Sequence, residues 1–359
     1  MQFWTIVSKR ILITSGGTGG HVFPALCVAK ELKKRGYDIV FSTDTRGFRY
    51  IENFKDSIII QKIHTDSRAK LCISLLINTS KSLFRIFKIK PELVIGFGGY
   101  PSVPFLLSAQ LLGIKTFVHE QNAIIGKANK FLSKMATKII TSFPETKKLS
   151  QNEKNIYIGN PTRYEELYNP VTTLHNNDIF IILIFGGSQG AKIFSKEVVE
   201  AICDFSKFTK IEVFHQGRVE DISRIKAKYD SHNVKNIVES FFKNIGKLYQ
   251  KANLIISRAG ASSIFEIIGF QKPSILIPYG KSINGDQIEN ANFLTKKNAA
   301  IAIEEDYLTK DKLTKTLIEL VKNKNKIETM RGNLCQIQTK DITKKFAEVV
   351  EKELYNHDL

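Results

Sequence analysis

One short pattern occurs twice in the chain, about 170 residues apart, and it restricts the possible folds more than any other feature. Each copy begins with an apolar run, residues 10–15 and 179–185, which is typical of a strand buried in a parallel sheet. A glycine-rich turn follows each run, Gly16-Gly17-Thr18-Gly19 in the first copy and Gly186-Gly187-Ser188-Gln189-Gly190 in the second. Apolar residues at helical spacing come next, and strands then alternate with helices. The sequence therefore predicts an α/β protein with two doubly wound, Rossmann-like domains of similar build.

The composition of the chain between the two copies indicates where the domains meet. Residues 159–177 are rich in Pro, Asn and Thr, as linkers often are. We expect an N-terminal domain at 1–160, a linker at 161–177 and a C-terminal domain at 178–338. Residues 339–359 contain an amphipathic helical pattern, and we expect this helix to pack back toward the N-terminal domain.

The charge of the chain favours an anionic partner. Lys and Arg number 53 against 35 Asp and Glu, which gives a formal net charge of +18. A phosphorylated substrate, an anionic membrane surface or a nucleic acid would explain this surplus, and so would a codon bias toward Lys, Ile and Asn. Because the sequence has no zinc motif, Arg-rich tract or aromatic RNA-binding motif, we expect no nucleic-acid partner.

The cysteines and the apolar segments indicate a cytoplasmic protein. Cys27, Cys72, Cys203 and Cys335 are widely separated and form no CxxC motif, so we expect neither a disulfide framework nor a metal site. No export signal is recognisable, and no segment approaches the roughly 20 apolar residues that span a bilayer. The protein is expected not to be integral to a membrane, although it could lie on one.

Three glycine-rich turns, 16–20, 96–99 and 186–190, each join a predicted strand to a predicted helix. Such a turn lets the backbone approach an anion closely, and the helix N-terminus offers unpaired N–H groups and a partial positive charge. A tight turn that needs positive φ is the alternative explanation for any one of them. Three turns in the same context favour a nucleotide or another phosphate ligand.

The residues leave the kind of nucleotide open. The Walker pattern is absent, and the first turn lacks the last Gly of GxGxxG. Asp44 nevertheless ends the second predicted strand, so a nicotinamide-dependent oxidoreductase remains an alternative. No DxD triplet occurs in the sequence. A diphosphate would then be held by backbone N–H groups and a cation such as Arg163 or Arg258.

Polar residues at predicted strand ends are candidates for chemistry. His21 directly follows the first turn and could be a general base or a ligand contact, or simply a satisfied buried histidine. Residues 119–122, His-Glu-Gln-Asn, end a strand and are either site residues or a solvated loop. Glu266, six residues after Gly260, could accept hydrogen bonds from two sugar hydroxyls or be a surface charge. Asp286 could be only a helix cap.

Seven motifs occur in order along the chain: GGTGGHVFPALCVAKEL, GFGGYPSVP, HEQNAIIGKAN, GNPTR, GGSQGAK, SRAGASSIFE and NGDQIENA. Together they closely resemble the MurG family of bacterial peptidoglycan glycosyltransferases, from about Ile11 to Ala300. The resemblance implies a GT-B fold, in which two Rossmann-like domains face each other across a cleft. It implies inverting transfer of GlcNAc from UDP-GlcNAc to the MurNAc C4 hydroxyl of undecaprenyl-pyrophosphoryl-MurNAc-pentapeptide, which converts lipid I into lipid II.

The resemblance also implies the setting of the reaction. No cofactor and no essential metal are expected, the C-terminal domain would hold UDP-GlcNAc, and the N-terminal domain would hold lipid I. The enzyme would be peripheral on the cytoplasmic face of the inner (plasma) membrane. A related glycosyltransferase with another lipid acceptor is the alternative within this class.

Matching the motifs residue by residue assigns roles. His21 is the expected general base, with Glu120 as the alternative. Gly98, Gly99 and Tyr100 would form an acceptor or phosphate loop. The expected substrate contacts are Thr18, Gly19, Gly20, Asn122, Arg163, Ser188, Phe242 (near the uracil), Ala261, Ser262, Ser263, Glu266 and Gln287. Asp286 departs from the His or Gln usual in the family, and residues 44–70 match poorly, so neither receives a role.

The segment 71–87 is a candidate membrane surface. Its apolar residues can share much of one helical face: Leu71, Leu75, Leu76, Leu83, Phe84 and Phe87. Cations flank that face: Lys70, Lys81, Arg85, Lys88 and Lys90. A basic helix with an apolar face is how a protein lies among lipid headgroups, and each close cation contributes about 1 kcal/mol near an anionic surface. We therefore expect an anionic cytoplasmic membrane surface as partner, with an ordinary core helix as the alternative.

Overall fold

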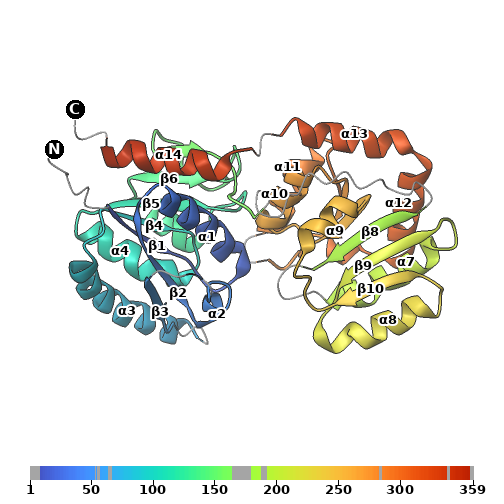
Figure 1. Cartoon of the computed structure of the whole chain (residues 1–359), viewed down its shortest axis with the longest axis horizontal. Coiled ribbons are helices and arrows are strands. Elements are labelled where there is room, and N and C mark those ends of the chain that lie inside the picture. Colours follow the sequence, from blue (N-terminus) through green and yellow to red (C-terminus); the bar gives the residue numbers. More distant parts are fainter. Residues whose placement is uncertain are drawn as a thin grey trace, which may run out of the picture. The chain divides into compact units, whose positions relative to one another are not determined.

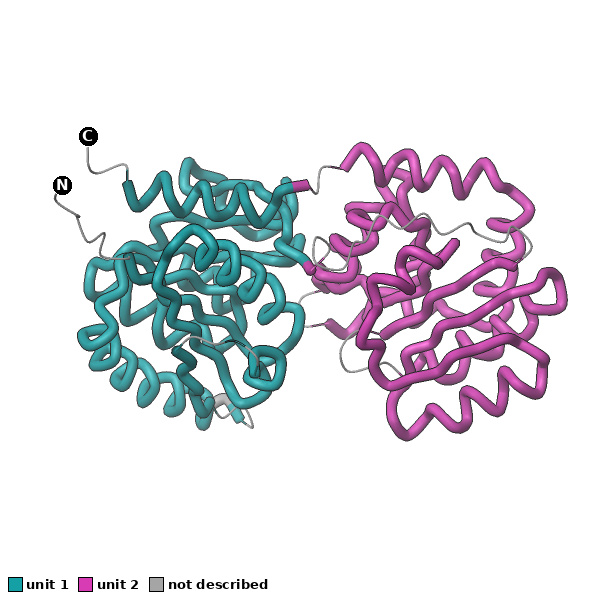
Figure 2. Tube along the Cα trace, in the orientation of Figure 1, with its two compact units in different colours: residues 1–162, 341–359 teal, residues 163–340 magenta. Residues whose placement is uncertain are grey.

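The structure is a computed structural model that describes residues 9–52, 54, 57–63, 67–163, 179–186, 192–282, 285–337 and 340–355. The chain forms two compact units (Figure 2). Unit 1 contains residues 1–162 and 341–359, and unit 2 contains residues 163–340. The chain thus leaves unit 1 and returns to it at its C-terminal end.

Unit 1 is built on a seven-stranded sheet with the order β3-β2-β1-β4-β5-β6-β7 (Figure 1). All its neighbouring strands pair in parallel. The strands are β1 (Arg10–Thr14), β2 (Asp38–Asp44), β3 (Ser57–Gln61), β4 (Leu93–Gly96), β5 (Lys115–Glu120), β6 (Lys138–Thr141) and β7 (Asn155–Tyr157). Because the chain order reverses between β1 and β4, the carboxyl ends of these two strands form the switch point at which doubly wound sheets bind ligands.

Helices cover both faces of this sheet. Successive residues of a strand point to opposite faces, so Ile11 and Ile13 pack in the core with α1 and α14, whereas Leu12 packs in the core with α3 and α4. The helices are α1 (Gly19–Lys34), α2 (Thr45–Phe48), α3 (Arg68–Ile89), the 3₁₀ turn η1 (Tyr100–Ser102), α4 (Val103–Leu111), α5 (Lys127–Leu132) and α14 (Ile342–Tyr355). Both faces of unit 1 are therefore closed by helices, as a parallel sheet requires.

The C-terminal helix α14 is part of the core of unit 1. Its Phe346 ring stacks on Phe97 with 5.6 Å between ring centroids. At its far end, the Nζ of Lys115 donates a hydrogen bond to the backbone oxygen of Glu353 at 2.6 Å. Apolar burial and polar contacts thus both hold this helix against a sheet that lies more than 200 residues earlier in the chain.

Unit 2 repeats the design with a six-stranded parallel sheet of order β10-β9-β8-β11-β12-β13. Its strands are β8 (Phe180–Phe185), β9 (Ile211–Gln216), β10 (Lys235–Glu239), β11 (Leu254–Ser257), β12 (Ser274–Leu276) and β13 (Ile301–Ala302). Its helices are η2 (Lys192–Ser195), α7 (Glu197–Phe205), η3 (Val219–Asp221), α8 (Ile222–Asp230), α9 (Ile245–Lys251), α10 (Ala261–Phe270), α11 (Asp286–Thr295), η4 (Glu305–Tyr307), α12 (Lys310–Lys322) and α13 (Lys324–Cys335).

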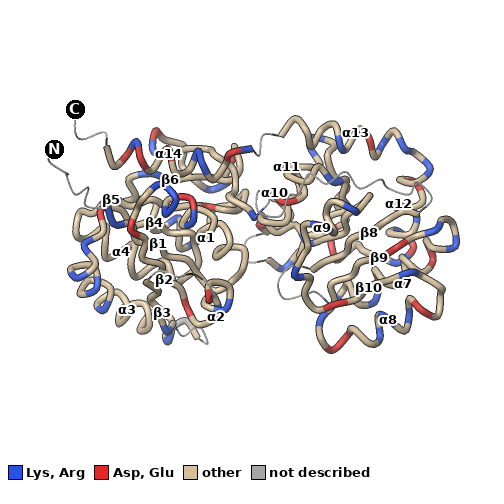
Figure 3. Tube along the Cα trace, in the orientation of Figure 1, with Lys and Arg blue, Asp and Glu red and all other residues tan. Residues whose placement is uncertain are grey.

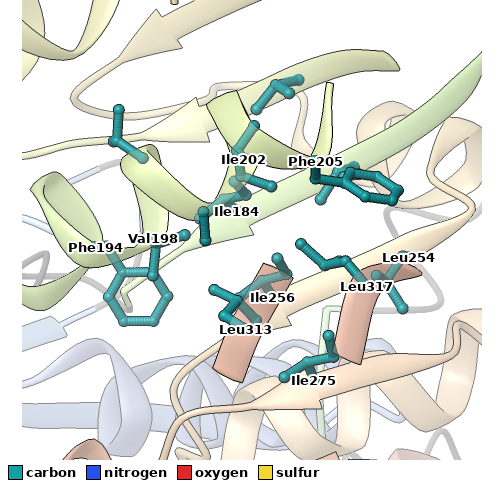
Figure 4. Close-up of a cluster of buried hydrophobic side chains, with 14 of the residues drawn as sticks. Ile184, Phe194, Val198, Ile202, Phe205, Leu254, Ile256, Ile275, Leu313 and Leu317 are labelled. Carbon is teal, nitrogen blue, oxygen red and sulfur yellow. The ribbon is translucent and has the colours of Figure 1, made fainter. Parts of the chain in front are cut away.

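The core of unit 2 is formed between its sheet and two helices that are distant in sequence. Figure 4 shows Ile184, Ile256 and Ile275 of the sheet facing side chains of α7 and α12, among them Ile202 and Leu317. All of these side chains are buried. The predicted fold class, two doubly wound Rossmann-like domains, is confirmed by the two sheets and their strand orders.

Candidate functional site

Two glycine turns meet at the switch point of unit 1. The amide of Gly16, just after β1, donates to the carbonyl of Gly98, just after β4, at 3.1 Å. A Cβ atom at Gly16 would lie 2.7 Å from Cδ of Pro101, and Gly98 and Gly99 have φ values of 77° and 76°. The close approach at Gly16 and the left-handed backbone at Gly98 and Gly99 explain why glycine stands at these positions.

The first turn presents a helix N-terminus at the same edge. Thr18 is the N-cap of α1, and its side chain makes no capping hydrogen bond. Gly19 and Gly20 are the first two residues of the helix, where amides have no intrahelical acceptor. The predicted contacts Thr18, Gly19 and Gly20 therefore lie together at a helix end suited to an anion.

A cation that the sequence reasoning missed lies over this turn. A Cβ atom at Gly17 would be 2.6 Å from Nη2 of Arg46, so the guanidinium covers the backbone of the turn. Nη2 of Arg46 donates a hydrogen bond to Oδ2 of Asp44 at 2.9 Å. Oδ1 of Asp44 accepts the amide of Gly47, also at 2.9 Å. The Asp-x-Arg spacing was the available signal. Asp44 is thus engaged with Arg46 and Gly47, which removes the feature that kept a nicotinamide site as an alternative.

His21 lies beside the second turn. The position of a Cβ atom at Gly98 is 3.2 Å from Nδ1 of His21 and 3.3 Å from Oε1 of Gln121. Gln121 is buried and donates from Nε2 to the carbonyl of Phe97 at 2.6 Å. The half-buried imidazole of His21 therefore adjoins both glycine turns, next to a fixed amide side chain.

The polar segment 119–122 is not a solvated loop, because His119, Glu120 and Gln121 are buried. His119 lies in the core, where its ring is 5.0 Å from that of Phe97 and its Nε2 is 3.2 Å from Oγ of Ser142. Burial lowers the pKa of His119 to about 3, so the ring is neutral at pH 7. His119 is therefore a structural histidine.

The carboxylate of Glu120 is saturated with donors from the following loop. Oε1 accepts the amide of Asn122 at 3.0 Å, and Oε2 accepts the amide of Gly126 at 2.9 Å and Nδ2 of Asn129 at 2.8 Å. Burial raises the pKa of Glu120, while these hydrogen bonds act in the opposite direction. Glu120 therefore stabilises the conformation of the loop around Asn122. Because its oxygens are already occupied by these donors, His21 is favoured as the base.

In unit 2 the N-terminus of α10 forms a second anion-binding feature. Gly260 is its N-cap, and Ala261, Ser262 and Ser263 supply the first-turn amides that lack intrahelical acceptors. The buried Oγ of Ser262 has no hydrogen-bond partner among the described residues. Three predicted contacts therefore lie on one helical turn, with a hydroxyl ready to bind a ligand oxygen.

One turn further along α10, Glu266 links this helix to two other segments. Its Oε2 accepts the hydroxyl of Tyr249 at 3.1 Å, and its Oε1 accepts Nη2 of Arg163 at 3.3 Å. The structure thus brings the predicted contacts Arg163 and Glu266 together. Each carboxylate oxygen has a second lone pair, so Glu266 can still accept a hydroxyl from a ligand.

Two predicted residues lie on the neighbouring helix α11. Oε1 of Gln287 accepts the amide of Tyr279 at 3.0 Å, which ties the loop after β12 to this helix. Oδ1 of Asp286 accepts the amide of Gln287 at 3.0 Å, so Asp286 has a local structural role. Gln287 therefore lies at the helix start that follows the loop carrying Tyr279.

Arg258 is engaged in structural contacts and is not the diphosphate cation suggested as an alternative to Arg163. Its Nη1 pairs with Oε2 of Glu305 at 2.8 Å, and its guanidinium lies over the rings of Phe194 and Tyr279. The side chain is buried. Among the two arginines considered, Arg163 is the accessible one.

The aromatic residue predicted near the base of the nucleotide is buried. Phe242 is only 7% exposed, whereas the preceding Phe241 is 56% exposed. Sequence reasoning could not separate two adjacent phenylalanines in the loop between β10 and α9. Phe241 offers the ring face that a ligand can reach. Ser188, by contrast, lies outside the described residues.

Helix α3 buries several polar residues and exposes several apolar ones. Its buried polar residues are spaced four apart: Ser74, Asn78 and Ser82. Asn78 donates from Nδ2 to the carbonyls of Lys62 at 3.0 Å and Ser74 at 2.8 Å, which satisfies the buried amide. The outward side chains Leu76, Phe84 and Phe87 are 70%, 63% and 64% exposed. Such an exposed apolar stripe marks an interaction surface.

Within the described residues, no helix is both long and apolar enough to cross a bilayer. No group of three or more His, Cys, Asp or Glu residues in the same part of the chain is arranged to hold a metal ion.

Comparisons with known proteins match almost the whole chain. Residues 11–141 match the glycosyltransferase family 28 N-terminal domain, and residues 181–350 match the glycosyltransferase family 28 C-terminal domain. A protein of Wolbachia sp. subsp. Brugia malayi (strain TRS) is 35% identical over 342 residues, 95% of this chain and 98% of its own. A protein of Agrobacterium fabrum (strain C58) is 37% identical over 323 residues, 86% of this chain and 84% of its own.

Both relatives are named UDP-N-acetylglucosamine--N-acetylmuramyl-(pentapeptide) pyrophosphoryl-undecaprenol N-acetylglucosamine transferase. Among solved structures, the crystal structure of Acinetobacter baumannii MurG is similar with a TM-score of 0.81 at 27% identity. The match covers 96% of this chain and 99% of that one.

Proposed function

Because the chain belongs to glycosyltransferase family 28, we propose that it transfers N-acetylglucosamine from UDP-GlcNAc to the MurNAc C4 hydroxyl of undecaprenyl-pyrophosphoryl-MurNAc-pentapeptide. The observation that carries this proposal is the near-complete match to relatives named for that activity. The described site residues support it, because each unit has a helix N-terminus suited to phosphate beside groups suited to sugar hydroxyls.

The reaction is a single displacement at the anomeric carbon. The acceptor oxygen forms the new bond to that carbon, the bond to the β-phosphate oxygen breaks, and UDP leaves with the electron pair. The acceptor proton passes to His21, whose imidazole adjoins the two glycine turns of unit 1. Histidine is the side chain that most often acts as a general base in such a transfer.

Unit 2 is the proposed donor side. The first-turn amides of α10, from Ala261 to Ser263, would bind the diphosphate, where fixed N–H dipoles stabilise the charge that develops on the leaving group. Glu266 would accept the two ribose hydroxyls, with Arg163 paired to the same carboxylate. The exposed ring of Phe241 would stack on uracil. Gln287 and Ser188 remain expected contacts to UDP-GlcNAc in this proposal.

Unit 1 is the proposed acceptor side. The turn of Gly98 and Gly99, followed by Tyr100, would hold the acceptor beside His21. Gly19 and Gly20, the first residues of α1, would bring to a phosphate the amides that have no intrahelical acceptor. Asn122, positioned by Glu120, keeps its expected role as a polar contact to substrate.

A lipid-linked acceptor would bring the enzyme to a membrane surface, and its place there is expected to be peripheral, on the cytoplasmic face of the inner (plasma) membrane. The exposed apolar stripe of α3, with Lys81, Arg85 and Lys88 on the same helix, supports this surface as the contact. Charge reversal of these three cations should weaken binding to vesicles that contain anionic lipid by about tenfold or more. Reversal of Lys226, Lys228 and Lys235 in unit 2 is the matched control. Equal losses from both triple variants would contradict a contact through α3.

The function is tested by incubating the purified protein with labelled UDP-GlcNAc and a lipid-linked MurNAc-pentapeptide. The expected product is a labelled lipid disaccharide, formed with or without EDTA. Transfer to water alone, or to the lipid carrier without MurNAc, would overturn the proposed acceptor. An enzyme that loses all turnover in EDTA would overturn the expectation that the backbone amides hold the diphosphate unaided.

A further inference from the structure

Helices α3, α4 and α5 of unit 1 enclose an open groove of about 420 Å³. This volume lies within the roughly 300–1,000 Å³ of small-molecule sites. Most of the groove is lined by apolar side chains: Leu75, Leu76, Val103, Leu107, Ala128 and Phe131. The remaining lining comes from Cys72, Thr79, Tyr100 and Lys127. The groove is thus an apolar channel with a cation and a phenol on its wall.

The chain connects this groove directly to the expected base. Tyr100 lines the groove and immediately follows Gly98 and Gly99. On the other side, the position of a Cβ atom at Gly98 is 3.2 Å from the ring of His21. One short turn therefore borders both His21 and the apolar groove. A ligand that places a reacting hydroxyl at His21 would reach this groove by passing Tyr100.

The charge around the groove favours a ligand with an anionic end. The three helices carry no Asp or Glu, and they carry seven cations: Arg68, Lys70, Lys81, Arg85, Lys88, Lys127 and Lys130. Figure 3 shows α3 in blue and tan without red. Lys127 is itself a lining residue and is exposed. A diphosphate next to Lys127 would be attracted while its apolar chain enters the groove.

We propose that this groove binds the isoprene units of the acceptor that lie nearest its diphosphate, with Tyr100 between the sugar end and the lipid end. The identity of this ligand rests on the proposed function. The groove shares Leu76 with the outward stripe of α3, but it lies between three helices and adjoins the Gly98–Tyr100 turn, whereas Phe84 and Phe87 of the stripe do not line it. It selects one lipid chain from the bilayer instead of contacting the bilayer surface.

Cys72 gives a direct test that needs no turnover. It is exposed and lines the groove, and Cys335 of unit 2 is also exposed and serves as an internal reference. Farnesyl diphosphate should slow alkylation of Cys72 by a maleimide at least fivefold and leave the rate at Cys335 unchanged. Inorganic diphosphate should protect neither cysteine. Unchanged alkylation of Cys72, or equal slowing at both cysteines, would overturn the proposal.

A straight-chain probe separates an isoprenoid site from a general lipid site. Dodecyl phosphate, used below its micelle concentration, should protect Cys72 at least threefold less than farnesyl diphosphate. Equal protection would assign the groove to bilayer lipids and overturn the isoprenoid assignment.

Variants of the intact enzyme provide a second measurement. Cys72→Trp would fill the groove from its rim, and Lys352→Trp adds the same ring at an exposed position of α14, outside both the groove and the α3 stripe. The first should raise KM for the lipid-linked acceptor about tenfold, with kcat and the donor KM within twofold. The control should change none of these. Equal acceptor KM values for the two variants would contradict the groove. Farnesyl protection without GlcNAc transfer would instead contradict the proposed function alone.

Discussion

Replacing Glu266 with Gln tests the donor side of the site with almost no change in shape. In the structure, one carboxylate oxygen accepts the Tyr249 hydroxyl at 3.1 Å and the other accepts Arg163 at 3.3 Å. Each oxygen keeps a lone pair for one ribose hydroxyl. Glu266→Gln leaves one neutral acceptor and turns a donor toward the second hydroxyl.

The expected loss follows from these contacts. Hydrogen bonds to a charged group contribute about 1.5–3 kcal/mol, against about 0.5–1.5 kcal/mol for neutral ones. Weakening one bond to ribose and losing the other should cost about 2–3 kcal/mol, or roughly 30- to 150-fold in Kd. Isothermal titration with UDP measures this change, and thermal unfolding checks that the variant is folded.

Tyr249→Phe is the matched control. It removes the buried hydroxyl from the same carboxylate but keeps the charge and both ligand-facing lone pairs. We expect about 1 kcal/mol less stability and a Kd for UDP within about threefold of wild type. If Glu266→Gln bound UDP within twofold of wild type, the proposed ribose contact would be refuted. If both variants lost affinity equally, Glu266 would act through packing and not through its charge.

Other expectations follow from residues in both units. His21→Ala should lower kcat by about 10²–10⁴ while the Kd for UDP stays within twofold; an unchanged kcat in steady-state assays would exclude His21 as the base. Phe241→Ala should weaken UDP binding about fivefold or more and spare binding of a diphosphate without a base; equal effects on the two ligands would exclude stacking. Burial lowers the pKa values of His119 and His215 to about 3, below the ordinary 6.5, so the unfolded chain binds more protons between these values and stability falls as the pH falls. Between pH 7.5 and pH 5, each histidine should lower the free energy of unfolding, measured with urea, by about 2 kcal/mol. In His119→Gln, the free energy that unit 1 loses over this pH range should be smaller. If the pH dependence of this variant equalled that of wild type, a neutral buried ring at His119 would be contradicted.

The fold could be predicted from sequence because its signals are local. The apolar runs at 10–15 and 179–185 became β1 and β8, and the first glycine turn lies at the end of β1 as expected. The second turn, from residue 187 on, falls outside the described residues. A parallel strand that is buried on both faces has few alternatives once such a run ends in glycine.

Side-chain surroundings could not be predicted, because they depend on contacts that are distant in sequence. The apolar periodicity of α3 gave no indication of which face is buried, and the inward face is the one with Ser74 and Asn78. The polar residues 119–121 are buried because Phe97, Ser142 and Asn129 come from other segments to contact this part of the chain. Arg258 is enclosed by residues that lie tens of positions away.

The most direct test of the proposed chemistry is the configuration of the new glycosidic bond, read from the anomeric proton coupling of the purified product by NMR. UDP-GlcNAc carries an α linkage, so a single displacement by the acceptor hydroxyl, with His21 taking the proton, predicts a β-linked disaccharide. An α-linked product, or free GlcNAc as the only product, would contradict it.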